Sequence, residues 1–444
     1  MNWIKKYFSY FLIIVSIFFL TYIIYISEIY WNGNLRYYYF KYYIFSFILF
    51  LISFLSFFLS VKIKTYITII MFSIIFGLYL FELYLFFFIK GINFDTRTKV
   101  QAFLDKKTNI TDLVLSVTPS NYLDKDVEVF PLSGISNSNT LDCNESGYYS
   151  IVETDRYGFN NPDEVWDKDN IDYALIGDSF VWGSCVNRPN DLGSVIKNIS
   201  KSTVLNLGYG GNGPLASYAS IKEYLPRQTK NIIWFYYEGN DNQNLLSELE
   251  NKFLKNYYFK KNFNQNLKTK HDIIDTMGKK EITELIIKKN EKSKLILFDR
   301  IKILKLNEVR FIIGGYYEYI RRQLKNTNNE IDRKTPEKEI TKVVKLMKIN
   351  SDKIGANLYF VYLPEYARFK HKYSNKNYKK IKNIINKNEI YFIDIIEEVF
   401  KKTNNPLEYF PNNLRGSDLH YNEKGYFEIG NTVYKHLELR DFLN

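Results

Sequence analysis

The stretch that decides the fold is Tyr173-Ala-Leu-Ile-Gly-Asp-Ser-Phe180, a short apolar run that ends in a Gly-Asp-Ser turn. A run of this length next to a glycine predicts a buried strand followed by a tight turn. The same arrangement recurs twice. Thr203–Leu207 runs into the glycine-rich turn Gly208–Pro214, and Asn231–Tyr237 runs into Glu238-Gly-Asn-Asp241. Each polar turn therefore follows the carboxyl end of a predicted strand.

Helical segments are predicted between these strands, near Asp191–Lys197 and Leu215–Tyr224, and two further strands at Asn357–Leu363 and Ile390–Asp394. Strands that alternate with helices form a parallel sheet with helices on its faces. In such sheets, sites form at the carboxyl ends of the strands. We therefore expect an α/β domain over residues 171–444, with its site built from the polar turns.

Four blocks of sequence at these turns resemble the SGNH/GDSL hydrolase superfamily. Each block alone is a weak signal, and the order of all four carries the resemblance. The blocks are Gly177-Asp-Ser179, the turn around Gly211, Gly239-Asn240 and a late Asp418-Leu-His420. The resemblance implies a flavodoxin-like, three-layer αβα sandwich with a parallel sheet. It also implies a catalytic site made of Ser179, Gly211, Asn240 and His420.

The residue types suit acyl transfer from an ester. Ser179 is a weak nucleophile until a base removes its proton, and His420 can act as that base. Asp418 can hold the imidazole in the required tautomer. The backbone N–H groups of Ser179 and Gly211 and the amide of Asn240 would stabilise the oxyanion. The pattern predicts a serine hydrolase acting on ester bonds, with no metal and no cofactor.

Each candidate also has a simpler interpretation. Ser179 is consistent with a turn or helix-capping serine, His420 with a surface or capping histidine, and Asn240 with a turn-forming residue. Asp178 and Asp241 are interpreted as structural residues.

The blocks depart from the family pattern in three places. Asp418-Leu-His420 is one residue shorter than the usual Asp-x-x-His, which makes the role of Asp418 less certain. Gly239 directly precedes Asn240, where one residue usually intervenes. In the second block, Gly208 and Gly210 are alternatives to Gly211 as the glycine that matches the family pattern.

Three apolar runs precede this domain, at Tyr7–Ile26, Tyr42–Val61 and Ile67–Ile89, and Glu82 is the one charged residue within them. Each is long enough to cross a hydrocarbon core of roughly 30 Å as a helix. We expect residues 1–90 to form a three-helix transmembrane anchor. A cleaved signal peptide is the alternative for the first run, but no small-residue cleavage site follows it.

The positive charges at the helix ends predict the orientation of the chain. Cytoplasmic loops carry an excess of Lys and Arg, so the amino terminus and the loop between the second and third runs are expected in the cytoplasm. The residues that support this are Lys5, Lys6, Lys62 and Lys64. The segment after residue 90 would then lie outside the cytoplasm, as a multi-pass membrane protein with an extracytoplasmic or periplasmic catalytic domain.

Cys143 and Cys185 are the only cysteines in the chain. An even number in an extracytoplasmic domain fits one disulfide, and two free buried thiols are the alternative. The disulfide would tie residues 91–170, expected as a linker and covering segment, to the loop after Ser179.

The remaining features concern partners. The net charge is +12, but seven basic and two acidic residues lie in the first 94 residues around the apolar runs, and no nucleic-acid motif is present. We therefore expect the lipid bilayer as a partner and no nucleic acid. Residues 242–356 form a helical insertion, either a cap beside the site or a packing extension.

The resemblance implies an esterase or O-acyltransferase acting on acyl esters of cell-surface carbohydrate. A transferase would need an acyl donor, supplied through a partner membrane protein. A lipid or phospholipid esterase and a non-catalytic assembly protein with the same fold are the alternatives. Hydrogen-bond contact between Ser179 Oγ and His420 would favour the enzyme over the assembly protein.

Overall fold

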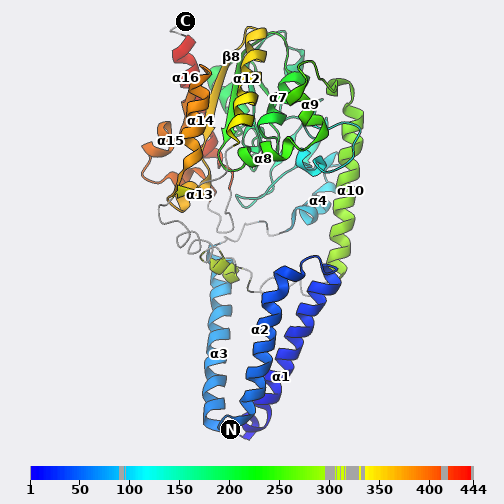
Figure 1. Ribbon diagram of the computed structural model, residues 1–444, viewed down its shortest axis with the longest axis vertical. Coiled ribbons are helices and arrows are strands. Elements are labelled where there is room, and N and C mark those ends of the chain that lie inside the picture. The colour runs from blue at the N-terminus through cyan, green and yellow to red at the C-terminus, as the bar shows by residue number, and fades with distance from the viewer. Residues whose placement is uncertain are drawn as a thin grey trace. The chain divides into compact units, whose positions relative to one another are not determined.

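The computed structural model describes residues 2–89, 95, 97–295, 306, 308–310, 312–314, 316, 330–331, 336–411 and 419–441 (Figure 1). The chain divides into two compact units. The first is Met1–Phe86 with Ile303–Val309, and the second is Phe87–Lys302 with Arg310–Asn444.

The first unit contains three long apolar helices, α1 (Asn2–Ile24), α2 (Arg36–Leu55) and α3 (Val61–Tyr84). With the short turns that extend them, they give three segments long and apolar enough to cross a membrane. These segments are Tyr7–Tyr30, Arg36–Phe58 and Val61–Phe87. The three predicted helices are therefore confirmed as long and apolar enough to span a membrane, and the second and third begin six residues earlier than expected.

Side-chain burial in this unit is the reverse of that in a water-soluble bundle. Large apolar side chains point outward, and Phe18 and Phe72 are 62% and 69% exposed. Small polar side chains lie inside, and the Ser53 hydroxyl of α2 donates to the Leu12 carbonyl of α1 across 3.2 Å. Helices in lipid pack through small residues and interhelical hydrogen bonds, because lipid tails already solvate the apolar surface. This pattern fits a bundle surrounded by lipid.

Glu82 of α3 is buried in the first unit. Its carboxylate accepts the backbone N–H groups of Glu308 and Val309 at 3.1 and 2.9 Å. The first N–H groups of a helix have no partner within it, and a carboxylate there satisfies them. Glu82 thus attaches a piece of the insertion to the helix bundle.

The second unit is built on a five-stranded parallel sheet. In spatial order its strands are β5 (Val204–Asn206), β4 (Ile171–Ile176), β6 (Thr229–Tyr237), β8 (Asn357–Leu363) and β10 (Tyr391–Asp394). Counted along the chain, this order is 2-1-3-4-5, that of a flavodoxin-like sheet. The predicted α/β sandwich with a parallel sheet is therefore confirmed.

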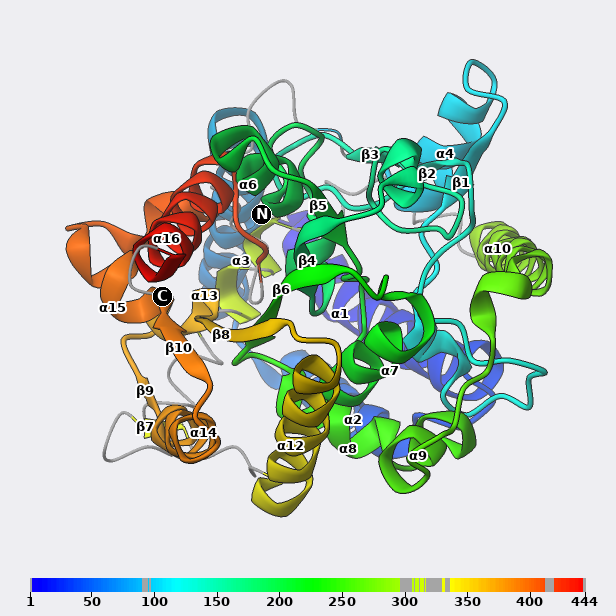
Figure 2. The same cartoon turned by 90° about the horizontal axis from the view of Figure 1, so that it is seen from above.

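Both faces of this sheet are covered by helices, as Figure 2 shows. Alternate side chains of β6 enter the two cores, with Trp234 and Tyr236 in one and Phe235 and Tyr237 in the other. The covering helices are α7 (Pro214–Tyr224), α12 (Glu337–Lys353) and α14 (Lys376–Lys387) on the first face, and α6 (Leu192–Ser200) and α16 (Glu423–Asp441) on the second. These are the three layers implied by the resemblance.

The covering segment forms a small sheet of its own. It contains α4 (Lys99–Lys107) and the strands β1 (Leu113–Leu115), β2 (Asn139–Leu141) and β3 (Ile151–Glu153). β2 runs parallel to β1 and antiparallel to β3, so that β2 and β3 form a hairpin with a loop over residues 142–150. The small sheet shares its core with the first face of the large sheet. The covering segment is therefore packed into the second unit.

The insertion begins with α8 (Asp241–Glu248), α9 (Lys252–Phe259) and α10 (His271–Leu295), and ends in α12. Because α12 packs on β8 and α7, this end of the insertion is a layer of the sandwich. The remaining short elements are α5 (Ser179–Trp182), β7 (Glu330–Ile331), α13 (Tyr366–Lys370), β9 (Ser374–Asn375) and α15 (Ile395–Glu398).

Candidate active site

Ser179 stands at the carboxyl end of β4, in the turn that begins α5. Gly177 in this turn has φ +152°, and a Cβ there would lie 2.6 Å from Val181 Cγ2 and 2.8 Å from the Phe235 carbonyl oxygen. Only glycine fits, because the turn is pressed against the neighbouring strand. Asp178 caps α5 by accepting the Phe180 N–H at 3.0 Å. The capping role is thus filled by Asp178, and the hydroxyl of Ser179 is left for another partner.

That partner is His420. Ser179 Oγ lies 2.8 Å from Nε2 of the imidazole. On the other side of the ring, Nδ1 lies 2.9 Å from Oε1 of Glu145, and the backbone N–H of His420 donates to Oε2 of the same carboxylate at 2.7 Å. A ring that donates from Nδ1 to a carboxylate has Nε2 free to accept the hydroxyl proton. Ser179, His420 and Glu145 therefore form a continuous chain of hydrogen bonds.

The electrostatics of His420 follow from this arrangement. Its side chain is 20% exposed, and that of Glu145 is 16% exposed. Burial opposes the charged imidazolium, but the Glu145 carboxylate outweighs this, with help from Asp142 and Asp178, and raises the pKa of His420 to about 9. The imidazolium that forms when the ring takes a proton is thus well stabilised.

The second turn lies against the covering segment. Gly211 has φ +85°, and a Cβ there would lie 3.1 Å from Ser120 Oγ and 3.3 Å from Thr118 Cβ. A Cβ on Gly210 would lie 3.4 Å from Thr118 Cγ2 and 3.8 Å from Ser179 Cβ. The glycine turn thus brings its backbone close to both Ser179 and the covering segment, with Gly210 facing the serine.

The third turn is held by a buried ion pair. Glu238 accepts Nε and Nη2 of Arg368 at 2.6 and 2.5 Å, and it also accepts the Tyr362 hydroxyl at 2.8 Å. Two residues later, Asn240 precedes α8 without a side-chain hydrogen bond to the helix. Its Oδ1 is buried and has no hydrogen-bond partner among the described residues. Asn240 therefore lies at the strand end in the N-cap position of α8, but its side chain does not cap the helix.

Asp241 makes a structural contact below this turn. One carboxylate oxygen accepts the Tyr237 N–H at 2.9 Å. Burial, together with the nearby negative charge of Asp178, raises its pKa well above the usual range of a carboxyl group. A carboxyl buried in this way binds the end of β6 to the start of α8.

The disulfide between Cys143 and Cys185 is formed, with a Cα–Cα distance of 5.0 Å. It joins the loop of the β2–β3 hairpin to the chain just after α5, as the prediction required. Glu145 is two residues from Cys143, so the disulfide lies beside the hydrogen-bonded chain. Cys185 Sγ is 3.4 Å from Nδ1 of His420.

Comparisons with known proteins find distant similarities in structure. No family model and no curated protein match the sequence. A G-D-S-L family protein from Desulfitobacterium hafniense, described as lipolytic, is 12% identical over 60% of this chain and 99% of its own, with a TM-score of 0.32. The protein YxiM from Bacillus subtilis is 13% identical over 61% of this chain and 57% of its own, with a TM-score of 0.33.

At these scores the similarities carry no weight in the interpretation of the site. The interpretation of the site rests instead on the strand order and on the positions of the sequence blocks at the strand ends. The fold is flavodoxin-like. Ser179 lies at the carboxyl end of β4. The strand order reverses between β4 and its neighbour β6, and α/β sheets bind ligands at such a switch point.

Glu145 is the site residue that the sequence patterns did not reveal. Asp418, the predicted partner of the imidazole, lies outside the described residues, so its role stays a prediction. Among the described residues, the carboxylate on Nδ1 belongs to Glu145, 275 positions away from His420 in the chain. The one pointer to it was the expected disulfide, which brings the neighbourhood of Cys143 to the loop after Ser179.

Four potential metal ligands gather here. Donor atoms of Cys143, Glu145, Cys185 and His420 lie within 4.8 Å of one another. Thiolates bind metals, and in the disulfide neither sulfur is a thiolate. The oxidised site therefore lacks two of these four ligands. The other two, Glu145 and His420, are hydrogen-bonded to each other.

Proposed function

We propose that the chain is a membrane-anchored serine esterase or O-acyltransferase of the SGNH type, with Ser179 as nucleophile, His420 as base and Glu145 as the acid that orients the imidazole. The observation that carries the proposal is the 2.8 Å contact between Ser179 Oγ and His420 Nε2, completed by Glu145 on Nδ1. This is the arrangement that activates a serine hydroxyl.

The reaction follows from the hydrogen bonds. Ser179 Oγ attacks the carbonyl carbon of an ester while His420 Nε2 takes the hydroxyl proton. When the tetrahedral intermediate breaks down, the alcohol leaves and takes the proton from His420. Water, or a second hydroxyl, then attacks the acyl-serine with His420 again as the base. Glu145 stabilises the imidazolium in both halves of the reaction.

The oxyanion of the intermediate needs preorganised donors at the strand ends. The backbone N–H groups of Ser179 and Gly211 and the side-chain amide of Asn240 are the proposed donors. Support comes from Asn240, whose side chain does not cap α8, and from the close approach of the glycine turn to Ser179.

The proposed substrate is an acyl ester of cell-surface carbohydrate. If a sugar hydroxyl takes the place of water, the protein is a transferase and receives its acyl group through a partner membrane protein. The proposed location is the bilayer, with the catalytic unit on the extracytoplasmic side. Lysines at the ends of the spans and the Cys143–Cys185 disulfide support this side, because disulfides persist in oxidising compartments.

The test is covalent labelling of the full chain in detergent with a fluorophosphonate probe. Wild type and the matched control Ser202→Ala are expected to label, and Ser179→Ala is expected not to. Ser202 lies in the loop between α6 and β5, and among the described residues its hydroxyl donates only to the Ser200 carbonyl, so the loss of this hydroxyl is a fair control. Failure of folded wild type to label would refute a serine hydrolase.

Substrate class is tested on the same preparation with p-nitrophenyl acetate, a p-nitrophenyl ester of a long-chain acid and an acetylated polysaccharide. Release of acetate from the polysaccharide is expected. A strong preference for the long-chain ester would instead point to a lipid substrate.

A further inference from the structure

The loop of the β2–β3 hairpin delivers Glu145 to His420. Its two ends are joined by backbone hydrogen bonds, from Asp142 N–H to the Ser150 carbonyl at 2.9 Å and from Ser150 N–H to the Cys143 carbonyl at 3.0 Å. Glu145 lies within this loop, and its two carboxylate oxygens meet the ring and the backbone of His420. The position of the acid therefore depends on where the loop is held.

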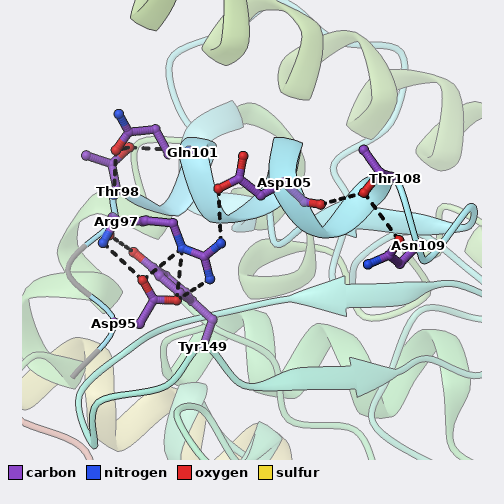
Figure 3. A network of polar contacts seen from close by, with 8 residues as sticks. All are labelled: Asp95, Arg97, Thr98, Gln101, Asp105, Thr108, Asn109 and Tyr149. Carbon is purple, nitrogen blue, oxygen red and sulfur yellow. Dashed lines mark hydrogen bonds and ion pairs between the residues drawn. The ribbon is translucent and has the colours of Figure 1, made fainter. Parts of the chain in front are cut away.

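One side of the loop is held by the chain that enters α4. Asn144 donates to the Asp95 carbonyl at 2.7 Å, and the Tyr149 hydroxyl donates to the Arg97 carbonyl at 2.8 Å. Figure 3 shows the network in which Arg97 is fixed, through its ion pairs with Asp95 and Asp105. None of these contacts touches Ser179 or His420.

The disulfide holds the other side, directly at the catalytic serine. Cys185 is 1% exposed and follows α5, so that it is six residues from Ser179 in the chain. It has φ +70°, a conformation that residues other than glycine rarely adopt and that surrounding structure must impose. Cys143 is thus tied to a rigid point beside the nucleophile.

We propose that this disulfide is the positioning device for Glu145, so that the oxidised protein is the active esterase and reduction by a dithiol lowers its activity. The inference rests on the proposed function. In the reduction, the dithiol gives two electrons and two protons, the Cys143–Cys185 bond breaks, two thiols form, and the reductant becomes a disulfide.

Reduction acts on His420 in two ways. The loop loses its covalent tie near the ring, so the Glu145 carboxylate is held on Nδ1 by noncovalent contacts alone and leaves it more readily. In addition, reduction creates a thiol on Cys185 next to the ring, because Cys185 Sγ lies 3.4 Å from His420 Nδ1 in the disulfide form. A thiol that donates to Nδ1 would leave the hydrogen on Nε2, and that tautomer cannot accept the Ser179 proton.

The pH profile distinguishes this role from a general structural one. Among the described residues, the charged groups that act on His420 are Glu145 and Asp142 of the hairpin and Asp178 of the turn after β4. Because the imidazole must be neutral to act as base, activity in the oxidised protein should rise with pH towards about 9. Loss of Glu145 from the ring lowers the pKa of His420 and moves this rise to lower pH.

The experiment measures p-nitrophenyl acetate hydrolysis by the full chain in detergent, across pH, before and after dithiothreitol. A chelator is present throughout, because the two free thiols with Glu145 and His420 would form a potential metal site. Thiol counting confirms reduction. We expect kcat to fall by about 10²–10⁴ on reduction, by analogy with loss of the triad acid. The pH rise should move to lower pH, and both should return on reoxidation.

The matched measurement repeats the reduction in Glu145→Gln. If the disulfide acts through Glu145, this variant starts low and changes by less than about threefold on reduction, since the two losses share one cause. An equal fall in both backgrounds, from unfolding or any other cause, would overturn the inference. So would an unchanged kcat and pH profile in reduced wild type. Absence of hydrolysis and of fluorophosphonate labelling in oxidised wild type would instead refute the proposed function.

Discussion

Two regions of the second unit meet at His420, and they are held in different ways. The turns after β4, β5 and β6 are fixed by the buried strands in front of them and by close packing, as at Gly177. The hairpin loop with Glu145 is fixed by partners distant in sequence, the disulfide to Cys185 and the contacts to residues 95 and 97.

This difference separates Ser179, the proposed nucleophile, from Glu145, its proposed support. Ser179 keeps its place as long as the sheet is folded. Glu145 keeps its place only while the hairpin is attached. Changes in the turns should therefore remove steps of the reaction, whereas changes in the hairpin should act through the charge and tautomer of His420. The following variants test that distinction.

The largest effect is expected where the two regions meet. His420→Ala removes the base from Ser179 and should lower kcat for p-nitrophenyl acetate by about 10⁴–10⁶, and the double variant with Ser179→Ala should lose no more than either single variant. His436→Ala is the matched control, because this histidine lies on α16 and its ring bonds to the Tyr391 hydroxyl of β10, away from the serine. A His420→Ala enzyme with near wild-type kcat would rule out the proposed base.

Glu145→Gln tests the hairpin alone. The amide keeps the shape but loses the charge, so kcat should fall by about 10³–10⁴ through the wrong tautomer of His420. The acidic limb of the pH profile should also move to lower pH, because the carboxylate is what raises the pKa of His420 to about 9.

Asp418→Asn is measured beside Glu145→Gln, because Asp418 is the other candidate for the acid. The hydrogen bonds to Glu145 predict the smaller loss for Asp418→Asn. A larger loss in Asp418→Asn than in Glu145→Gln would assign the role of the acid to Asp418, as the sequence block implies.

The same contrast explains what the sequence could predict. All five strands of the large sheet were predicted to within two residues at each end. Strand patterns and polar turns are local, and a flavodoxin-like order brings the turns of β4 and β6 together without further information. The positions of Ser179 and Asn240 at the strand ends could therefore be predicted from the patterns around them.

Glu145 could not be found in that way. Its partner is 275 residues distant, and Cys143-Asn-Glu145 has no periodic or turn signal that marks a catalytic acid. Glu82 gives the same lesson in the first unit, because its contacts are backbone N–H groups more than 220 residues away. Side chains that pair across such separations are set by tertiary structure alone.

Asn240→Ala tests a turn without touching His420. Loss of one oxyanion donor typically lowers kcat by about 10²–10³, so a fall in that range is expected, with the pH profile unchanged because His420 keeps Glu145. Asn242→Ala on α8 is the control, since its side chain accepts the Tyr236 hydroxyl at 2.7 Å inside the core. A shifted pH profile in Asn240→Ala would argue against a pure oxyanion role.

The smallest effect concerns the fit between the glycine turn and the covering segment, and it is measured as stability. Gly211→Ala places a Cβ at φ +85° and 3.1 Å from Ser120 Oγ, whereas Gly210→Ala meets only ordinary contacts, the nearest at 3.4 Å. An alanine in the left-handed region costs about 1–2 kcal/mol, so the thermal midpoint of Gly211→Ala should fall by a few degrees and that of Gly210→Ala by less.

Adding Ser120→Ala to Gly211→Ala separates the two causes of this loss. The second change removes the hydroxyl that the new Cβ would press against, and it leaves the backbone conformation as it was. Partial recovery of the midpoint is expected, because the backbone cost remains while the side-chain contact is relieved. Full recovery would show that contact with the covering segment, and not the left-handed backbone, is what requires glycine at this turn.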